Sequence, residues 1–166
     1  QLYEEVAPVI FDPKVMPKRV NQAAGEDLVL TSACNYYDGV TQQEAEAFYS
    51  AMKDPKDETP VSYGLNSRLV KENGKIQEKV WKVGGLYGAA IGKIVYWLKK
   101  AEGVAENPEQ KAVIAKLVEF YETGDLKTFD DYAILWVKDL DSRIDFVNGF
   151  TESYGDPLGM KASWES

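Results

Sequence analysis

Apolar residues recur at intervals of three and four along much of the chain, which is the spacing of one face of an α-helix. The segments with this pattern lie at 2–10, 41–53, 87–102, 107–124 and 126–138. Their ends carry helix signals as well: Thr41 and Glu44 fit a capping box, and Asn107 followed by proline is typical of a helix N-terminus. We therefore predict five helices.

Strand character appears in two places. Residues 28–33, LVLTSA, are short, apolar and β-branched, which predicts a buried strand. Residues 67–72 and 75–82 alternate roughly between apolar and polar on either side of Asn73–Gly74, a pair that supplies the positive φ angles of a type I′ turn. These two segments are expected to form a β-hairpin. The end of the chain, with its glycines and a proline, is expected to be extended or turn-rich.

Helices and strands are segregated along the chain instead of alternating as βαβ units, so we predict an α+β fold. It is expected to be mostly helical, with the helices packed on a small antiparallel β-sheet that includes the hairpin at about 67–82. No internal repeat or low-complexity tract divides residues 1–166, which favours a single domain. Both ends look cut, and we expect the chain to be a piece of a longer protein.

Charge and cysteine content narrow the possible functions. The chain has 27 acidic and 19 basic residues and a net charge of −8, which disfavours binding to nucleic acid. It has no histidine and one cysteine, which excludes an internal disulfide, an ordinary zinc, haem or copper site, and catalysis by a histidine-activated nucleophile. Without such activation, Cys34 is expected to be a small buried apolar residue rather than a nucleophile.

A glycine-rich stretch, VGGLYGAAIGKIV, could suggest a nucleotide-binding loop, but it matches no such motif. Its glycines lack the spacing of a phosphate-binding or a dinucleotide-binding loop. A lysine that follows after roughly ten apolar or small residues argues against a membrane helix, which needs about 20. We instead expect Gly84, Gly88 and Gly92 to let a helix lie close to the sheet.

The acidic residues after the last predicted helix could suggest a calcium site. Asp139, Asp141 and Asp145 follow the spacing with which a calcium-binding loop begins. However, Arg143 and Ile144 stand where that loop requires an oxygen ligand and a glycine. We therefore predict no metal site in this chain.

Four stretches of the sequence together resemble one enzyme family. In chain order they are NYYDGVTQQEAEAFY, YGLNSRLVKENG, GKIVYWLKKA and GFTESYGDPLG, of which the last is the most specific. On these motifs the chain resembles the dipeptidyl peptidase III family, zinc exopeptidases that remove dipeptides from the N-termini of peptides. The resemblance extends from about Ala24 to Ser166.

The resemblance implies a two-lobed parent enzyme whose upper, helical lobe binds zinc through a His-Glu-x-x-Gly-His helix and a further glutamate. None of those residues is present in this chain. The resemblance implies that the chain is part of the lower, substrate-holding lobe, upstream of the zinc motif, with no catalytic residue and no cofactor of its own. The implied partners are an oligopeptide substrate and the upper lobe of the same protein, without nucleic acid or membrane. No targeting segment is visible, so a cytoplasmic location is expected. A non-catalytic helical interaction domain is the alternative.

The resemblance also assigns candidate substrate-binding residues. In the family, an acidic side chain shortly before the Gly–Phe pair helps to bind the free α-amino group of the substrate, and Asp145 has that position. An ordinary surface aspartate is the alternative. Glu152, in the signature string, is the second candidate, although Glu152, Tyr154 and Asp156 could instead hold a turn. Eukaryotic members carry a tyrosine where this chain has Val147, which suggests a bacterial-type member.

Overall fold

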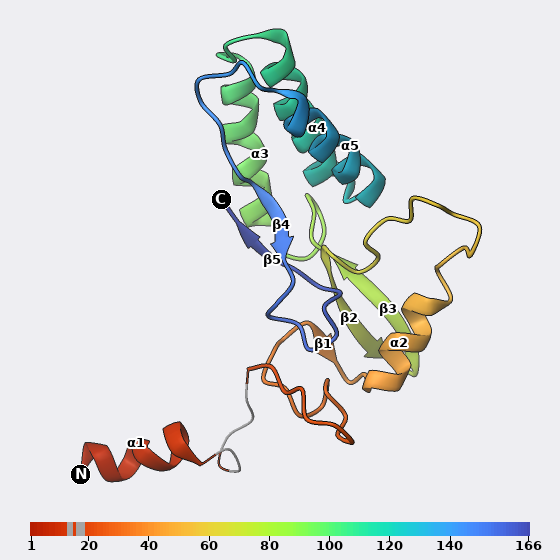
Figure 1. Cartoon of the computed structure of the whole chain (residues 1–166), viewed down its shortest axis with the longest axis vertical. Helices are drawn as coiled ribbons and strands as arrows, with labels where there is room; N and C mark the ends of the chain where they lie inside the picture. The colour runs from red at the N-terminus through yellow and green to blue at the C-terminus, as the bar shows by residue number, and fades with distance from the viewer. Residues whose placement is uncertain (13–14, 16–18) are drawn as a thin grey trace.

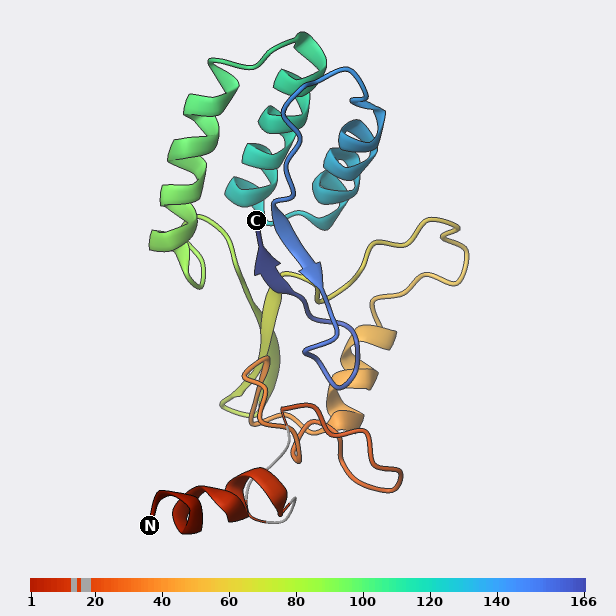
Figure 2. The ribbon, with the colours of Figure 1, turned by 60° about the vertical axis from the view of Figure 1, so that its left-hand side comes forward.

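The computed structural model describes residues 1–12, 15 and 19–166, and these are arranged as a helical end and a sheet end (Figure 1). The first helix, α1 (Leu2–Phe11), belongs to neither end. It projects away from the rest of the chain in both ribbon views, and none of its residues is buried (Figure 2). Within the described residues, no helix has both the length and the apolar character that a membrane span requires.

Three helices pack side by side at one end of the molecule (Figure 2). They are α3 (Gly88–Glu102), α4 (Pro108–Thr123) and α5 (Leu126–Lys138), and α4 contacts both of the others. Helix α4 begins where the sequence predicts, because Asn107 Oδ1 accepts a hydrogen bond from the Gln110 amide at 2.7 Å. It ends at Gly124, which has a left-handed φ of 72°. The three helices agree with the periodicity of the sequence.

The packing of these helices differs from the expectation that they cover a sheet. They lie mainly against one another, beyond the end of the strands (Figure 1). The physical reason is the wide apolar surface of α4. Its buried residues are Gln110, Val113, Ile114, Leu117, Val118, Phe120 and Tyr121. Because they face more than one direction around the helix, α4 can bury its surface against a neighbour on each side.

A three-stranded sheet forms the other end. Strands β2 (Ser67–Glu72) and β3 (Lys75–Val80) pair antiparallel as the predicted hairpin, with φ angles of 52° at Asn73 and 77° at Gly74. Strand β1 (Tyr37–Asp38) pairs with β2 in parallel, so this sheet is mixed rather than antiparallel. The parallel strand is too short to show a period of its own, which is why the sequence does not predict it.

Helix α2 (Gln42–Ser50) runs beside this sheet (Figure 1). The predicted capping box is present: the Thr41 hydroxyl accepts from the Glu44 amide at 3.2 Å, and Glu44 Oε2 accepts from the Thr41 amide at 3.1 Å. The helix ends three residues earlier than expected, and its buried face is formed by Ala45 and Tyr49.

A second, antiparallel pair of strands lies between the two ends (Figure 1, Figure 2). Its members are β4 (Gly149–Glu152) and β5 (Ser163–Glu165). The ring of Phe150 in β4 lies 5.0 Å from that of Trp81 and 6.3 Å from that of Phe120, measured between centroids. These aromatic contacts join the sheet end to the helical end. Five helices and two small sheets in the described part of the chain confirm the α+β class.

The prediction of a buried strand at 28–33 is wrong, because this segment forms turns. Asp27 organises them: its Oδ1 accepts from the amides of Val29 at 3.0 Å and Leu30 at 2.9 Å. The Asp27 carbonyl accepts from the Thr31 amide at 3.1 Å. An aspartate that satisfies nearby amides in this way competes with strand pairing. The aspartate before the apolar run is the signal that was missed.

In this stretch the closest approach of the backbone occurs at Gly85, which is not one of the three glycines expected to allow it. A Cβ at Gly85 would collide with the carbonyl oxygen of Val80, whereas a Cβ at Gly84 or Gly92 would have nothing within 4 Å. Among the three, Gly88 alone would have neighbours within that distance. The tight contact therefore belongs to the turn that follows β3, not to a helix lying on a sheet.

Candidate functional site

Asp145 lies in the segment that joins α5 to β4, and its side chain is exposed. One carboxylate oxygen, Oδ1, accepts hydrogen bonds from the indole Nε1 of Trp136 and from the Phe146 amide, both at 2.8 Å. The other oxygen, Oδ2, accepts none from the described residues. Burial, together with the charge of Asp145, raises the pKa of Tyr132 to about 12. The carboxylate is thus oriented by two donors and keeps one oxygen free for a ligand.

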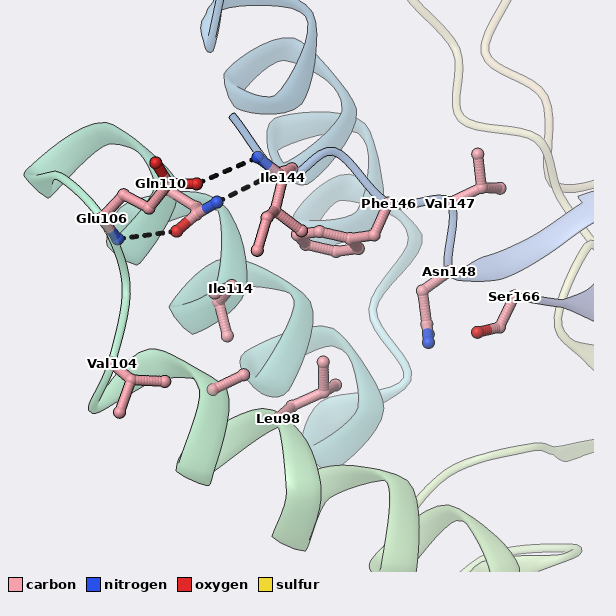
Figure 3. A pocket seen from close by; sticks show the side chains of 11 residues that line it. Leu98, Val104, Glu106, Gln110, Ile114, Ile144, Phe146, Val147, Asn148 and Ser166 are labelled. Atoms are coloured by element: carbon pink, nitrogen blue, oxygen red, sulfur yellow. Dashed lines mark hydrogen bonds between the residues drawn. The ribbon is translucent and has the colours of Figure 1, made fainter. Parts of the chain in front are cut away.

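The backbone of Ile144, directly before Asp145, is held by the side chains of Gln110, in the first turn of α4, and of Glu106, just before that helix (Figure 3). The Ile144 amide donates to Glu106 Oε1, and its carbonyl accepts from Gln110 Nε2, each at 2.9 Å. Gln110 Oε1 accepts from the Glu106 amide at 2.8 Å, which ties the two holding residues together. Hydrogen bonds from Arg143 and from the Ile144 amide hold the pKa of Glu106 below its usual range. Glu106 is therefore an ionised acceptor at neutral pH.

The other end of the 143–148 segment is fixed to α4 as well. Tyr121 OH donates to Asn148 Oδ1 at 2.5 Å and accepts from Trp164 Nε1 at 2.7 Å. Tyr121 is fully buried, and burial raises the pKa of its hydroxyl group, so it remains a protonated donor. Because α4 contacts the segment near both ends, the position of the segment follows that of α4.

A cavity of about 350 Å³ lies beside the segment, between it and helices α3 and α4 (Figure 3). Its lining is mostly apolar and includes Leu98 from α3 together with Ile144 and Phe146 from the segment. Asp145, between these two, is not part of the lining. Val147 and Asn148 also line the cavity, so Asp145 is the one residue of 144–148 that lies outside the lining.

The structure does not bring the two candidate substrate-binding residues into contact. Glu152 ends β4 and is half-buried, and its backbone carbonyl accepts from Ser163 Oγ at 3.3 Å. Its carboxylate forms no hydrogen bond or ion pair with Asp145 or with another of the described residues. Tyr154, two positions later, is exposed. A role of Glu152 in substrate binding stays a prediction.

Asp156 is buried and organises the turn after β4. Its two carboxylate oxygens accept hydrogen bonds at 2.8 to 3.2 Å. The donors are the Tyr37 hydroxyl and the amides of Leu158, Met160 and Lys161. A carboxylate bonded in this way on both oxygens holds the chain, and its geometry is that of a structural residue.

Sequence reasoning missed Lys161, which is fully buried. Its Nζ donates to Tyr49 OH at 2.5 Å, to Ser67 Oγ at 3.1 Å and to the Gly64 carbonyl at 3.3 Å. Both hydroxyl groups in turn donate to Glu78 Oε1. Burial lowers the pKa of Lys161 to about 8, although the charge of Glu78 acts in the opposite direction. No local pattern marks this lysine, because the three residues that receive its hydrogen bonds lie 94 to 112 positions earlier in the chain.

Neither the acidic run nor the cysteine forms a reactive site. Within the part of the chain that the structure describes, no group of three or more His, Cys, Asp or Glu side chains could hold a metal ion. Asp139 instead accepts a hydrogen bond from Ser142 Oγ at 2.7 Å. Cys34 is half-buried rather than buried, packs against the core, and has a thiol pKa that burial raises. A thiol with a raised pKa is a poor nucleophile at neutral pH.

Comparison with known sequences identifies relatives of the chain. The model of peptidase family M49 matches residues 29–166. Dipeptidyl peptidase 3 of Rattus norvegicus and that of Homo sapiens are 31% and 30% identical to the chain over 81 residues. Each alignment covers 49% of this chain and 11% of the relative, so the aligned half of the chain spans about a tenth of the relatives' length.

Comparison with solved structures shows the same fold in two larger proteins. Dipeptidyl peptidase III from Caldithrix abyssi has a TM-score of 0.62, with 92% of this chain and 29% of its own covered. The protein of the same name from Corallococcus sp. strain EGB has a TM-score of 0.59, with 78% and 23% covered. Both are 21% identical to this chain, and that likeness concerns the fold alone. The family match covers residues 29–166, which include the 143–148 segment and the turn at Asp156. The chain therefore belongs to peptidase family M49.

Proposed function

We propose that this chain is the substrate-binding part of a zinc-dependent dipeptidyl peptidase, and that residues 1–166 form one domain within its substrate-holding lobe. Membership of peptidase family M49 supports hydrolysis of peptide bonds. The names of the curated relatives support the release of dipeptides. The matches give no support to the non-catalytic interaction domain that the residues alone left open.

The observation that carries this proposal is the carboxylate of Asp145. It is exposed, it is oriented by Trp136 and by the Phe146 amide, and its Oδ2 is free. A charge-assisted hydrogen bond from an ammonium group to such an oxygen contributes about 1.5 to 3 kcal/mol. An internal stretch of a peptide carries no α-ammonium group, so this contact would favour substrates bound by their N-terminus. Glu152 is retained as the second candidate contact.

Zinc in such an enzyme would be bound by residues outside this chain. The chain has no histidine and one cysteine, and its described residues contain no cluster that could hold a metal ion. Its residues therefore do not fit a zinc site. What this part contributes is the binding and orientation of the peptide, by the segment that is fastened to α4.

The test is the substitution Asp145→Asn in the whole protein. Asparagine keeps the size and one acceptor oxygen but removes the charge that pairs with the substrate amine. For peptides with a free N-terminus, kcat/KM is expected to fall roughly 10- to 100-fold, equivalent to about 1.4 to 2.7 kcal/mol. Zinc content should stay the same. Peptides with an acetylated N-terminus, measured as competitive inhibitors, should bind equally well to both proteins, and equal losses on both classes would exclude the anchoring role.

A further inference from the structure

Two side chains, Glu106 just before α4 and Gln110 in its first turn, hold a single exposed residue of the neighbouring segment. The Ile144 amide donates to Glu106, and the Ile144 carbonyl accepts from Gln110, each at 2.9 Å (Figure 3). Both backbone polar groups of one residue are thus bonded to side chains. Such a pair of bonds restrains the position of the residue and also its rotation about the chain direction.

Burial alone does not explain why this part of the chain is fixed. Ile144 is 69% exposed, and the side chain of Arg143 is 91% exposed. Little apolar area is removed from water at these positions, and a connection with so little burial is usually mobile. The bonds from Glu106 and Gln110 are therefore the main restraints on the backbone directly before Asp145.

Gln110 is itself held rigidly. It is 6% exposed, its amide donates to the Asn107 cap at 2.7 Å, and its Oε1 accepts from the Glu106 amide at 2.8 Å. Its Nε2 then reaches Ile144. A side chain whose other polar groups are used by the helix start has little freedom to move. It transmits the position of α4 to the segment.

We propose that Glu106 and Gln110 are positioning residues, which set the place of the Asp145 carboxylate by fixing the backbone of Ile144. This inference rests on the proposed function, in which Asp145 binds the α-amino group of the substrate. Because Ile144 and Asp145 are adjacent, a displacement of the first moves the second. A misplacement of about 1 Å can cost up to roughly 100-fold in rate. The start of α4 thereby contributes to recognition of the peptide N-terminus without touching the peptide.

The experiment uses the whole protein and three variants. Gln110→Met has a similar volume and removes both side-chain hydrogen bonds, and Glu106→Ala removes the acceptor of the Ile144 amide. Glu106→Gln is the matched control, since it keeps an acceptor oxygen and loses an ion pair to the exposed Arg143, which contributes little. The measurements are KM for peptides with a free N-terminus, and inhibition constants of matched free and N-acetylated peptides.

Gln110→Met and Glu106→Ala are each expected to raise KM and to weaken the binding of peptides with a free amine about tenfold. The binding of acetylated peptides should not change. Glu106→Gln should remain within about twofold of the wild type. A purely structural role would instead weaken both classes of peptide equally. The double variant Gln110→Met/Asp145→Asn should lose no more affinity for peptides with a free amine than Asp145→Asn alone, because the charge that Gln110 helps to position is already absent.

Asp145→Asn in the same series separates this inference from the proposed function. If Asp145→Asn leaves the ratio of free to acetylated affinities unchanged, the proposed function fails. If that ratio falls for Asp145→Asn while Gln110→Met and Glu106→Ala leave it at the wild-type value, the positioning role is overturned. Should Gln110→Met fail to fold, Glu106→Ala decides, because the Glu106 side chain is 22% exposed and tolerates truncation more easily.

Discussion

Replacing Lys161 by methionine is expected to stabilise the protein at neutral pH. The lysine is fully buried, and methionine keeps its unbranched shape while removing the ammonium group. The hydroxyl groups of Tyr49 and Ser67 would keep a partner, because each also donates to Glu78. The substitution leaves no buried donor without an acceptor. The Gly64 carbonyl, which loses the Lys161 donor, still lies 3.3 Å from the Ser67 hydroxyl.

The size of the effect follows from the pKa of Lys161. Burial lowers this pKa from 10.5 to about 8, and each pKa unit corresponds to about 1.4 kcal/mol. Keeping the ammonium group charged inside the folded protein thus opposes folding by about 3 kcal/mol at neutral pH. The expected gain in the free energy of unfolding on Lys161→Met is of that order.

The gain in stability on Lys161→Met should decrease as the pH rises. Between about pH 8 and pH 10.5 the unfolded chain holds a lysine proton that the folded protein has lost, so the free energy of unfolding of the wild type rises with pH. Below about pH 8 the lysine is charged in both states, and the full penalty is present. The advantage of the variant is therefore largest near neutral pH and falls to about a quarter of that value by about pH 10.

Urea unfolding of both proteins at about pH 7, 8, 9 and 10 measures this advantage as a difference. The titrations of Cys34 and of the buried tyrosines occur in both proteins and cancel. Lys111→Met, at an exposed position of α4, is the control and should give a small difference that does not change with pH. A Lys161→Met protein that is less stable at neutral pH, or an advantage that stays constant up to about pH 10, would refute the reasoning.

Two further predictions concern the 166-residue chain by itself. It is expected to retain no zinc, because it has no histidine and a single thiol, and metal analysis after gel filtration that finds one zinc per chain would contradict this. It is also expected to unfold in one cooperative transition, since its helix caps and hairpin turn agree with the observed packing. A broad melt accompanied by binding of a hydrophobic dye would show instead that part of its core lies elsewhere.

Elements that carry their own chemical signal could be predicted from the sequence. The cap at Thr41 acts on a residue three positions away, as does the cap at Asn107. The turn at Asn73–Gly74 needs positive φ angles at two adjacent residues, which these two residue types adopt readily. Local chemistry of this kind does not depend on the rest of the fold. Overlooking such a local signal leads to a wrong prediction. At Asp27 the side chain accepts hydrogen bonds from the amides that follow, and the apolar run after it forms turns instead of a strand.

Features that depend on distant partners could not be predicted. The bonds that hold Ile144 come from residues 34 and 38 positions earlier, and the lysine buried at 161 needs partners from α2 and β2. Asp145 could be named as a candidate binding residue only through the resemblance of the sequence to a family. Its bond to Trp136 follows from no pattern in the sequence, because it requires α5 to end before the chain turns back toward β4.

The buried contacts of the last residues also set an order for folding during synthesis. The Tyr37–Asp156 and Tyr49–Lys161 hydrogen bonds join positions 119 and 112 residues apart. A ribosome adds roughly 5 to 20 residues per second, so the two tyrosines would wait roughly 6 to 24 seconds for these partners. Helices α3, α4 and α5, which contact their neighbours along the chain, have no such delay. The fold is thus completed from its C-terminal side, when the turn at Asp156 closes over the sheet and brings the lysine into the core.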